Sequence, residues 1–139
     1  AVYQAREAAA DTSKGIQHLP HYSWSGINDM VLPQGCRLVG IELIDEAIEL
    51  PSFRHPLRAA YVLGPERGSL SPEMLARCDY TVKIPTTFCI NVAMAGAIVM
   101  YDRVKSLGRF AVRPVGEGGP IAAPEPHVQG GRVVRSTKV

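Results

Sequence analysis

The chain has few aromatic residues, few cysteines and no long apolar run. Aromatic side chains make up 6% of its 139 residues. Its longest apolar stretch, near 92–101, is shorter than the roughly 18 residues that a membrane-spanning helix requires. No segment with a basic start and an apolar centre opens the chain, so nothing indicates export. We therefore expect no membrane partner and read the apolar stretch as a buried helix.

The cysteines exclude a disulfide framework. There are three, Cys36, Cys78 and Cys89, which is an odd number without any CxxC unit. Reduced thiols and a cytoplasmic location are the simplest interpretation. Neither Cys78 nor Cys89 has a histidine nearby in the sequence, which argues against nucleophilic thiol chemistry. His18 and His21 have an HxxH spacing, but no set of cysteines or carboxylates completes it, so we predict no metal site.

The remaining composition is that of a globular chain with a basic end. Hydrophobic residues make up 46% and charged residues 20%, which favours a compact core. Residues 1–102 hold 8 basic and 11 acidic residues (−3), whereas 103–139 hold 7 and 2 (+5). Residues 114–139 contain four Pro and five Gly, so we predict one domain over 1–113 and a flexible basic tail over 114–139. The tail could contact phosphate or only promote solubility, and charge alone does not decide this.

Local patterns predict alternating strands and helices. Ser71 offers an N-cap side chain and Pro72 suits a first helical position, while Gly108 follows basic residues as a helix stop. Residues 45–56 contain acidic residues and prolines typical of an irregular or partly helical segment. The predicted fold is α/β, with a mainly parallel sheet flanked by helices. Strands are expected over 37–43, 59–63 and 80–84, and helices over 2–10, 72–77 and 91–107.

Ligands of open parallel sheets bind beyond the carboxyl ends of the strands. Three such ends occur here, at 40–42, 64–68 and 84–90. The middle one, Gly64 to Gly68, offers backbone that a ligand can approach closely, although a simple tight turn would need the same glycines. These three loops are the candidate site.

Two linked motifs point to a family. Leu63-Gly64-Pro65-Glu66-Arg67-Gly68-Ser69-Leu70-Ser71 is followed by Ile84-Pro85 and by Cys89-Ile90-Asn91-Val92, which leads into a small-residue helix ending Met100-Tyr101-Asp102. In order and spacing these resemble the second and third motifs of the SpoU-type RNA 2′-O-ribose methyltransferases of the SPOUT superfamily. The resemblance covers roughly residues 37–108.

This resemblance implies a fold, a cofactor and a reaction. The fold has a deep trefoil knot at its C-terminal end, which forms a pocket for S-adenosylmethionine. The reaction is transfer of the methyl group of this cofactor to a ribose 2′-hydroxyl of tRNA or rRNA. The family acts as a homodimer. The small residues Ala93, Gly96 and Ala97 are compatible with a dimer interface and equally with packing inside one chain. By position, the residues implied to bind the cofactor are Ile41, Gly64, Glu66, Gly68, Ile84, Cys89 and Ile90.

The catalytic residues match only in part. Asn91 occupies the position of the third-motif asparagine, whose amide can orient a substrate or hold the pocket. Cys89 stands where the family usually has a serine, and a thiol is a weaker hydrogen-bonding group. The first motif, with its activating arginine, does not precede the matched region, and Arg6 lacks the surrounding pattern. We therefore expect either that part of the N-terminal region is missing or that the chain is a knotted module binding cofactor or RNA without turnover.

Two further groups carry weaker expectations. Tyr22 and Trp24 could stack on a base, although such residues more often anchor a loop. Four acidic residues could hold a metal, but a solvated face is the better interpretation. They are Glu42, Asp45, Glu46 and Glu49.

Overall fold

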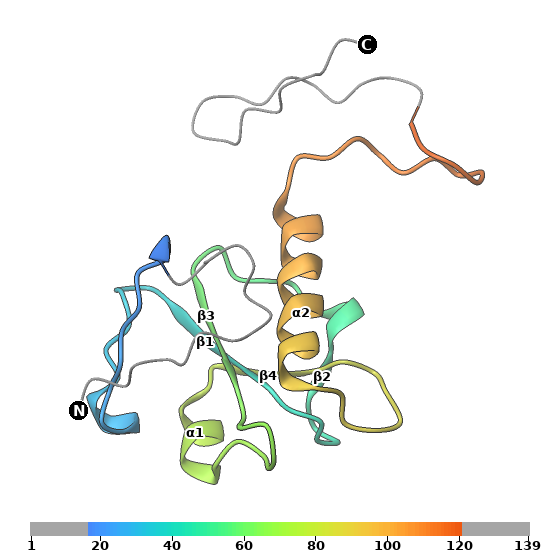
Figure 1. The fold of residues 1–139 in the computed structure, drawn as a ribbon. Helices are drawn as coiled ribbons and strands as arrows, with labels where there is room; N and C mark the ends of the chain where they lie inside the picture. The colour runs from blue at the N-terminus through green and yellow to red at the C-terminus, as the bar shows by residue number, and fades with distance from the viewer. Residues whose placement is uncertain (1–16, 121–139) are drawn as a thin grey trace.

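The computed structural model of the chain describes residues 17–120. The helix predicted over 2–10, Arg6 and the tail segment 121–139 lie outside these residues. Figure 1 shows the arrangement of the elements. In chain order they are η2 (Ile27–Asp29), β1 (Arg37–Ile41), β2 (Ile48–Glu49), η3 (Leu50–Ser52), β3 (Ala59–Leu63), α1 (Pro72–Arg77), β4 (Tyr80–Lys83) and α2 (Val92–Leu107).

The strands form one parallel sheet in the order β2-β4-β1-β3. Strand β1 is central, and its Ile41 lies beside Leu63 of β3 and Val82 of β4. This confirms the predicted α/β class with a parallel sheet. Because all four strands point the same way, the loops that leave their carboxyl ends emerge at a single edge.

Most predicted elements agree with the structure within two residues. Strand β3 and helix α1 have the predicted bounds, whereas β1 ends at Ile41 instead of residue 43 and β4 ends at Lys83. The prediction for 45–56 was wrong in one respect, because Ile48–Glu49 pairs with β4 as an edge strand. The helical turn η3 follows directly, so the segment is partly helical as expected.

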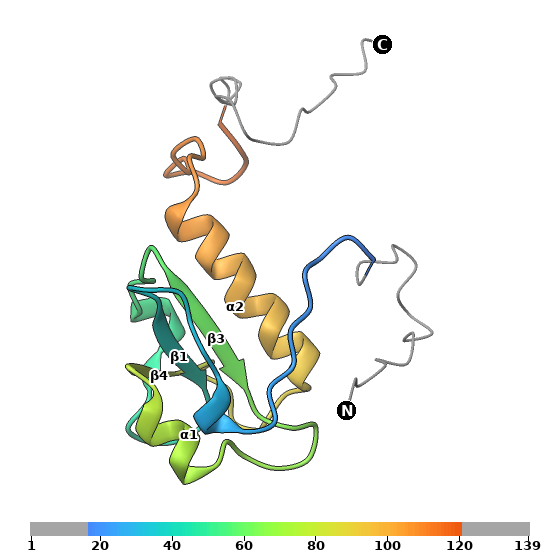
Figure 2. The ribbon, with the colours of Figure 1, turned by 90° about the vertical axis from the view of Figure 1, so that its left-hand side faces the viewer.

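The two faces of the sheet pack against different helices, and Figure 2 shows the sheet between α1 and α2. Side chains alternate across a strand, so Val39 and Ile41 of β1 face α2, together with Val82 of β4. There they form the core with Val99 of α2, which is 1% exposed. Burial of one such aliphatic side chain contributes roughly 1.5–3 kcal/mol. This packing fixes α2 across the sheet.

Both helices begin at a capping side chain. Ser71 Oγ accepts a hydrogen bond from the Met74 N–H at 3.2 Å, and Pro72 occupies the first turn, where its missing N–H costs nothing. Asn91 caps α2 in the same way. Lys105 lies in the last turn of α2, where its charge favours the negative end of the helix.

A partly buried polar cluster around the buried His55, which the sequence did not reveal, joins the end of α2 to the chain before β3. The side chain of His55 is fully buried and lies 2.6 Å from Tyr61 Oη and 2.9 Å from Asp102 Oδ2. Arg103 donates to Tyr61 Oη at 3.0 Å and to the backbone oxygens of Pro56 (2.7 Å) and residue 57 (2.8 Å). These bonds hold α2 at a fixed position against the sheet.

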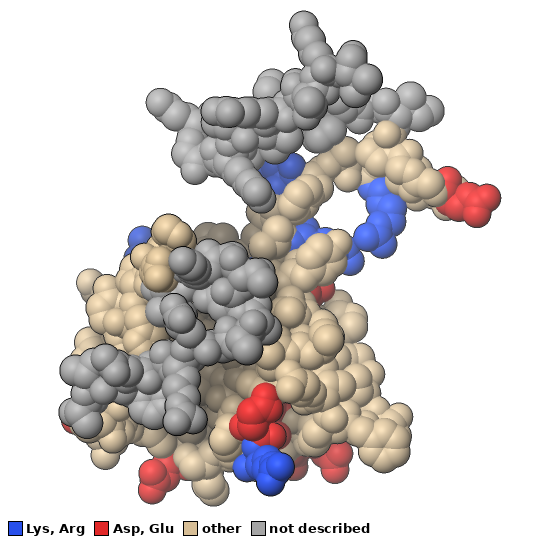
Figure 3. Space-filling view, in the orientation of Figure 1, with Lys and Arg blue, Asp and Glu red and all other residues tan. Residues whose placement is uncertain are grey.

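After α2, residues 109–120 form no helix or strand and are mostly exposed. They lie away from the sheet in both views (Figures 1 and 2). Figure 3 shows Lys and Arg side chains near this segment and most of the visible acidic side chains at the opposite, lower edge. Within residues 17–120, no helix is both long and apolar enough to span a bilayer.

Candidate cofactor site

The loops after β1, β3 and β4 enclose a cavity of about 320 Å³, at the edge where the strands end. Ligand pockets commonly have volumes of about 300–1,000 Å³, with largely apolar walls. The seven residues assigned to cofactor binding by sequence all line this cavity, although they come from three separate loops. The structure therefore brings together Ile41, Gly64, Glu66, Gly68, Ile84, Cys89 and Ile90.

The middle loop, residues 64–70, depends on two glycines. Gly68 has φ +136°, a backbone conformation that L side chains rarely adopt. At Gly64 an added Cβ would lie 3.3 Å from the backbone nitrogen of Leu70 and 3.4 Å from the carbonyl carbon of Ser69. The loop therefore folds back closely over Gly64, which explains why a glycine occupies the end of β3.

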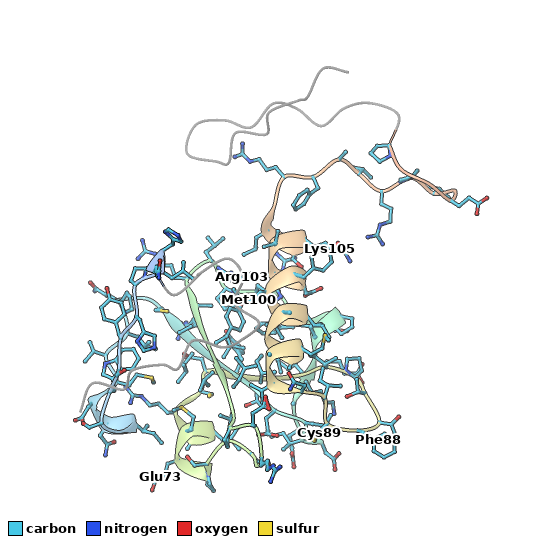
Figure 4. All side chains as sticks on the ribbon, viewed as in Figure 1. Glu73, Phe88, Cys89, Met100, Arg103 and Lys105 are labelled. Carbon is cyan, nitrogen blue, oxygen red and sulfur yellow. The ribbon has the colours of Figure 1, made fainter. Side chains whose placement is uncertain are left out.

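The third loop brings a free thiol to the cavity. Cys89 is exposed and lines the cavity, and Figure 4 shows it with Phe88 in the loop that leads into α2. Thr86 stabilises the loop by donating from Oγ1 to the Phe88 carbonyl oxygen at 2.8 Å. The backbone N–H of Thr86 donates to the Ile84 carbonyl oxygen, also at 2.8 Å. These bonds turn the chain sharply after β4.

Asn91 is placed between the third loop and the middle loop. Its Oδ1 accepts from the N–H groups of Ala93 (2.9 Å) and Met94 (3.2 Å) at the start of α2. Its Nδ2 donates to Glu66 Oε1 at 3.1 Å. Asn91 does not itself line the cavity, whereas Glu66 does. The amide therefore holds one wall of the cavity through Glu66.

The family comparison agrees with this arrangement of motifs. A family model described as the SpoU rRNA Methylase family matches residues 2–101, which is more than half of the chain. The chain belongs to the SpoU methylase family. A comparison with curated proteins found no match.

Membership of the SpoU family associates the chain with RNA methylation. The match begins at residue 2, well before the region in which the motifs were recognised. Within the described residues the cavity has charged lining residues of one sign only, Glu42 and Glu66. No lysine or arginine of that part of the chain lines it.

Sequence reasoning missed several lining residues. Glu42 was assigned to a solvated acidic face, but it directly follows Ile41 at the end of β1 and so reaches the cavity. That position was the signal available in the sequence. The other unassigned lining residues are Leu43, Leu63, Pro65, Ser69, Thr86, Val92 and Ala95.

The competing sites gain no support from the geometry. Within residues 17–120, no three His, Cys, Asp or Glu side chains are grouped to hold a metal, and His18 and His21 are exposed. Cys78 is half-buried, and burial, together with the charge of Asp79, raises the pKa of its thiol. A raised pKa reduces the thiolate fraction, which argues against a nucleophile at Cys78. Tyr22 and Trp24, by contrast, are exposed at 73% and 47%, as side chains that stack on a base must be.

Proposed function

We propose that this SpoU family member transfers the methyl group of S-adenosylmethionine to a ribose 2′-hydroxyl of tRNA or rRNA. One observation carries the proposal. The residues assigned to the cofactor by motif lie around one cavity, at the carboxyl edge of a parallel sheet. The proposal includes the knotted C-terminal region that the family resemblance implies.

The walls of the cavity suit the adenosine part of the cofactor. Aliphatic side chains from all three loops, among them Ile41, Leu63, Ile84 and Ile90, can contact the flat faces of adenine. Because Gly64 has no Cβ, the middle loop can fold back closely over it, and this packing shapes the wall of the cavity. Backbone N–H and C=O groups of the loops are available for the polar edges of the base.

The charge of the cavity suits the methionine part. S-adenosylmethionine carries a positive sulfonium, a positive ammonium and a negative carboxylate, which gives a net charge of +1, and among the described residues both charged ones that line the cavity are carboxylates. Opposite charges attract strongly where water is partly excluded. Glu42 and Glu66 therefore favour a cationic ligand over a neutral one.

The residues of this chain act by binding and alignment. When bound, the cofactor supplies the activated methyl group, which is the chemically demanding part of the reaction. The protein must hold the acceptor hydroxyl in line with that methyl group, and such alignment is a large source of rate enhancement. Asn91 contributes by fixing Glu66 and the start of α2. Cys89, in the position usual for serine, lines the cavity, where it can contact the cofactor or the acceptor ribose.

A second copy of the chain is proposed to cover the outer face of α2. Met94, Tyr101 and Val104 are 57%, 70% and 53% exposed there, and Ala93 and Ala97 are exposed beside them. Exposed apolar side chains on one helix face favour association. Arg109 and Arg113 follow α2 and add positive charge that can contact RNA phosphates. Light scattering should give twice the chain mass for the wild type, and the monomer mass for Val104→Asp. A monomeric wild type would contradict the dimer.

The reaction is tested by methyl transfer from labelled S-adenosylmethionine to an RNA pool. The RNA is then digested to nucleosides and separated, and we expect the label in a 2′-O-methylated nucleoside. Gly64→Trp, whose side chain would push against the backbone of the middle loop, should abolish incorporation, while Gly26→Ala, in open space, should not. Label on a base instead of a ribose would contradict the proposed chemistry. Cofactor binding without any incorporation would favour a module that binds without turnover.

A further inference from the structure

Glu42 connects the end of β1 to the end of the middle loop. Its Oε2 accepts a hydrogen bond from the Leu70 N–H at 2.7 Å, and its Oε1 accepts from the Leu43 N–H at 3.1 Å. Its own N–H donates to the Val82 carbonyl oxygen of β4 at 3.0 Å. Glu42 is thus bonded to the sheet through its backbone N–H and to the middle loop through its carboxylate. Hydrogen bonds to a charged acceptor are among the stronger ones in proteins.

Leu70 contacts β1 in a second way. Its side chain is 7% exposed and packs over Gly40, where an added Cβ would lie 3.3 Å from Leu70 Cδ1 and 2.9 Å from Cys78 Sγ. Gly40 lies on β1, and Glu42 directly follows the strand two residues later. The backbone and the side chain of Leu70 are therefore fixed to neighbouring points of β1.

These contacts place the exposed part of the loop. The loop starts at Gly64, directly after β3, whose Leu63 pairs with Ile41 of β1. It ends at Leu70, which Glu42 holds. Between these two anchors, residues 65–69 are exposed, and Pro65, Glu66, Gly68 and Ser69 line the cavity. The reach of the Glu42 side chain is therefore one determinant of the distance between the loop and β1, beside the packing of Leu70 over Gly40 and the bond from Asn91 to Glu66.

We propose that Glu42 is a positioning residue, which holds the middle loop through the Leu70 N–H at the distance from β1 that cofactor binding requires. The ligand named here rests on the proposed function. The role differs from a general attraction between the carboxylate and a cationic cofactor, since it depends on reach as well as on charge. It also differs from a role in overall stability, because Leu70 has its own apolar contacts.

Three substitutions separate these roles. Glu42→Gln removes the charge and leaves one acceptor oxygen, whereas Glu42→Asp keeps the charge and shortens the reach by one methylene. Positioning predicts that both raise the KM for S-adenosylmethionine, with kcat within about twofold of wild type, since the reacting groups are unchanged. Glu42→Ala should raise the KM by roughly tenfold or more, the effect of losing a hydrogen bond to a charged group. The control is Glu46→Gln, at an exposed carboxylate of the following turn, which should leave the KM unchanged.

Amide hydrogen exchange of the protein without cofactor tests the contact itself. The Leu70 N–H should exchange faster in Glu42→Gln and Glu42→Asp than in wild type, while amides of the central strand β1 stay protected. Melting temperatures identify any variant that fails to fold, and the isosteric glutamine variant then carries the test.

The possible results lead to different conclusions. A Glu42→Asp variant with wild-type KM, beside a weakened Glu42→Gln, would overturn positioning in favour of charge attraction. Wild-type KM in all three variants would overturn any role of Glu42 and leave the proposed function standing. If the wild type binds no S-adenosylmethionine, the proposed function fails, and the cofactor role of Glu42 fails with it. The rate of amide hydrogen exchange at Leu70, compared between wild type and the Glu42 variants, would still show whether Glu42 holds the loop.

Discussion

The side-chain amide of Asn91 joins the start of α2 to the carboxylate of Glu66. Its nitrogen lies 3.1 Å from Glu66 Oε1, while its oxygen accepts from the N–H groups of Ala93 and Met94. Glu66 belongs to the middle loop and Asn91 to the loop after β4, so the bond connects the two motifs from which the family was inferred. The same side chain thus has a structural and a site-forming contact, which substitution can separate.

Replacing Asn91 by serine should weaken cofactor binding with little loss of stability. Serine retains an oxygen that can cap α2 but has no donor long enough to reach Glu66. Asn91→Ala loses both contacts, so we expect it to be destabilised by about 1 kcal/mol as well. Urea denaturation measures the stability and calorimetry the binding. Wild-type binding by Asn91→Ser would show that the contact with Glu66 does not matter for the cofactor.

Gly64→Ala should impair binding through the shape of the middle loop. The added Cβ would crowd the backbone of Leu70 and Ser69, so the loop must shift outward. Overpacking costs about 1–3 kcal/mol, which corresponds to roughly a 5- to 150-fold loss of affinity if this cost falls on the binding-competent form of the loop. Gly26→Ala is the matched control, since its extended backbone and open surroundings accept a methyl group. Equal affinities for the two variants would contradict the need for close backbone approach at Gly64.

The parts that sequence predicted well are those fixed by local chemistry. Helix α1 begins where Ser71 and Pro72 indicated, because a capping side chain and a proline act on the residues next to them. Strand β3 was found because it is a short apolar run between turn-forming residues. The three loops of the site followed from the rule for parallel strands together with the family resemblance.

The parts that sequence did not predict depend on contacts between distant residues. Strand β2 has only two residues, and it exists because β4 pairs with it. The bond between His55 and Asp102 joins residues 47 positions apart, and no local pattern links the two. Glu42 was read with its acidic neighbours, whereas its role follows from Leu70, which lies 28 positions away.

Asp79 should make the stability of the protein depend on pH. Its carboxylate accepts from the Leu38 N–H at 2.8 Å and from Arg37 Nη1 at 2.9 Å, and these bonds, the backbone one first, lower the pKa of Asp79. The pKa of Asp79 is lower in the folded protein than in the unfolded chain, where it is about 3.9, so the carboxylate stabilises the folded protein above that pH. This contribution is lost as pH falls through the pKa of Asp79 in the folded protein. Asp79→Asn should therefore be less stable than wild type at pH 7.

The difference in free energy of unfolding between Asp79→Asn and wild type should shrink as pH falls below about 4, because the carboxylate is protonated first in the unfolded chain and then, at lower pH, in the folded protein. Urea denaturation between pH 7 and pH 3 measures it. Asp45→Asn, at an exposed carboxylate after β1, serves as the control. A difference that stays constant over this range would show that Asp79 acts through its shape instead of its charge.

Tyr61→Phe should destabilise the protein although it removes only one oxygen. Donors and acceptors in the partly buried polar cluster match when His55 carries its proton on Nε2: Arg103 donates to Tyr61, Tyr61 to His55 Nδ1, and His55 to Asp102. Phenylalanine leaves the buried Nδ1 without its donor, which costs about 1–3 kcal/mol. Tyr22→Phe removes the same group from a side chain that is 73% exposed and should change stability by less than about 0.5 kcal/mol. Urea denaturation compares them, and equal stabilities would contradict a cooperative polar cluster beneath α2.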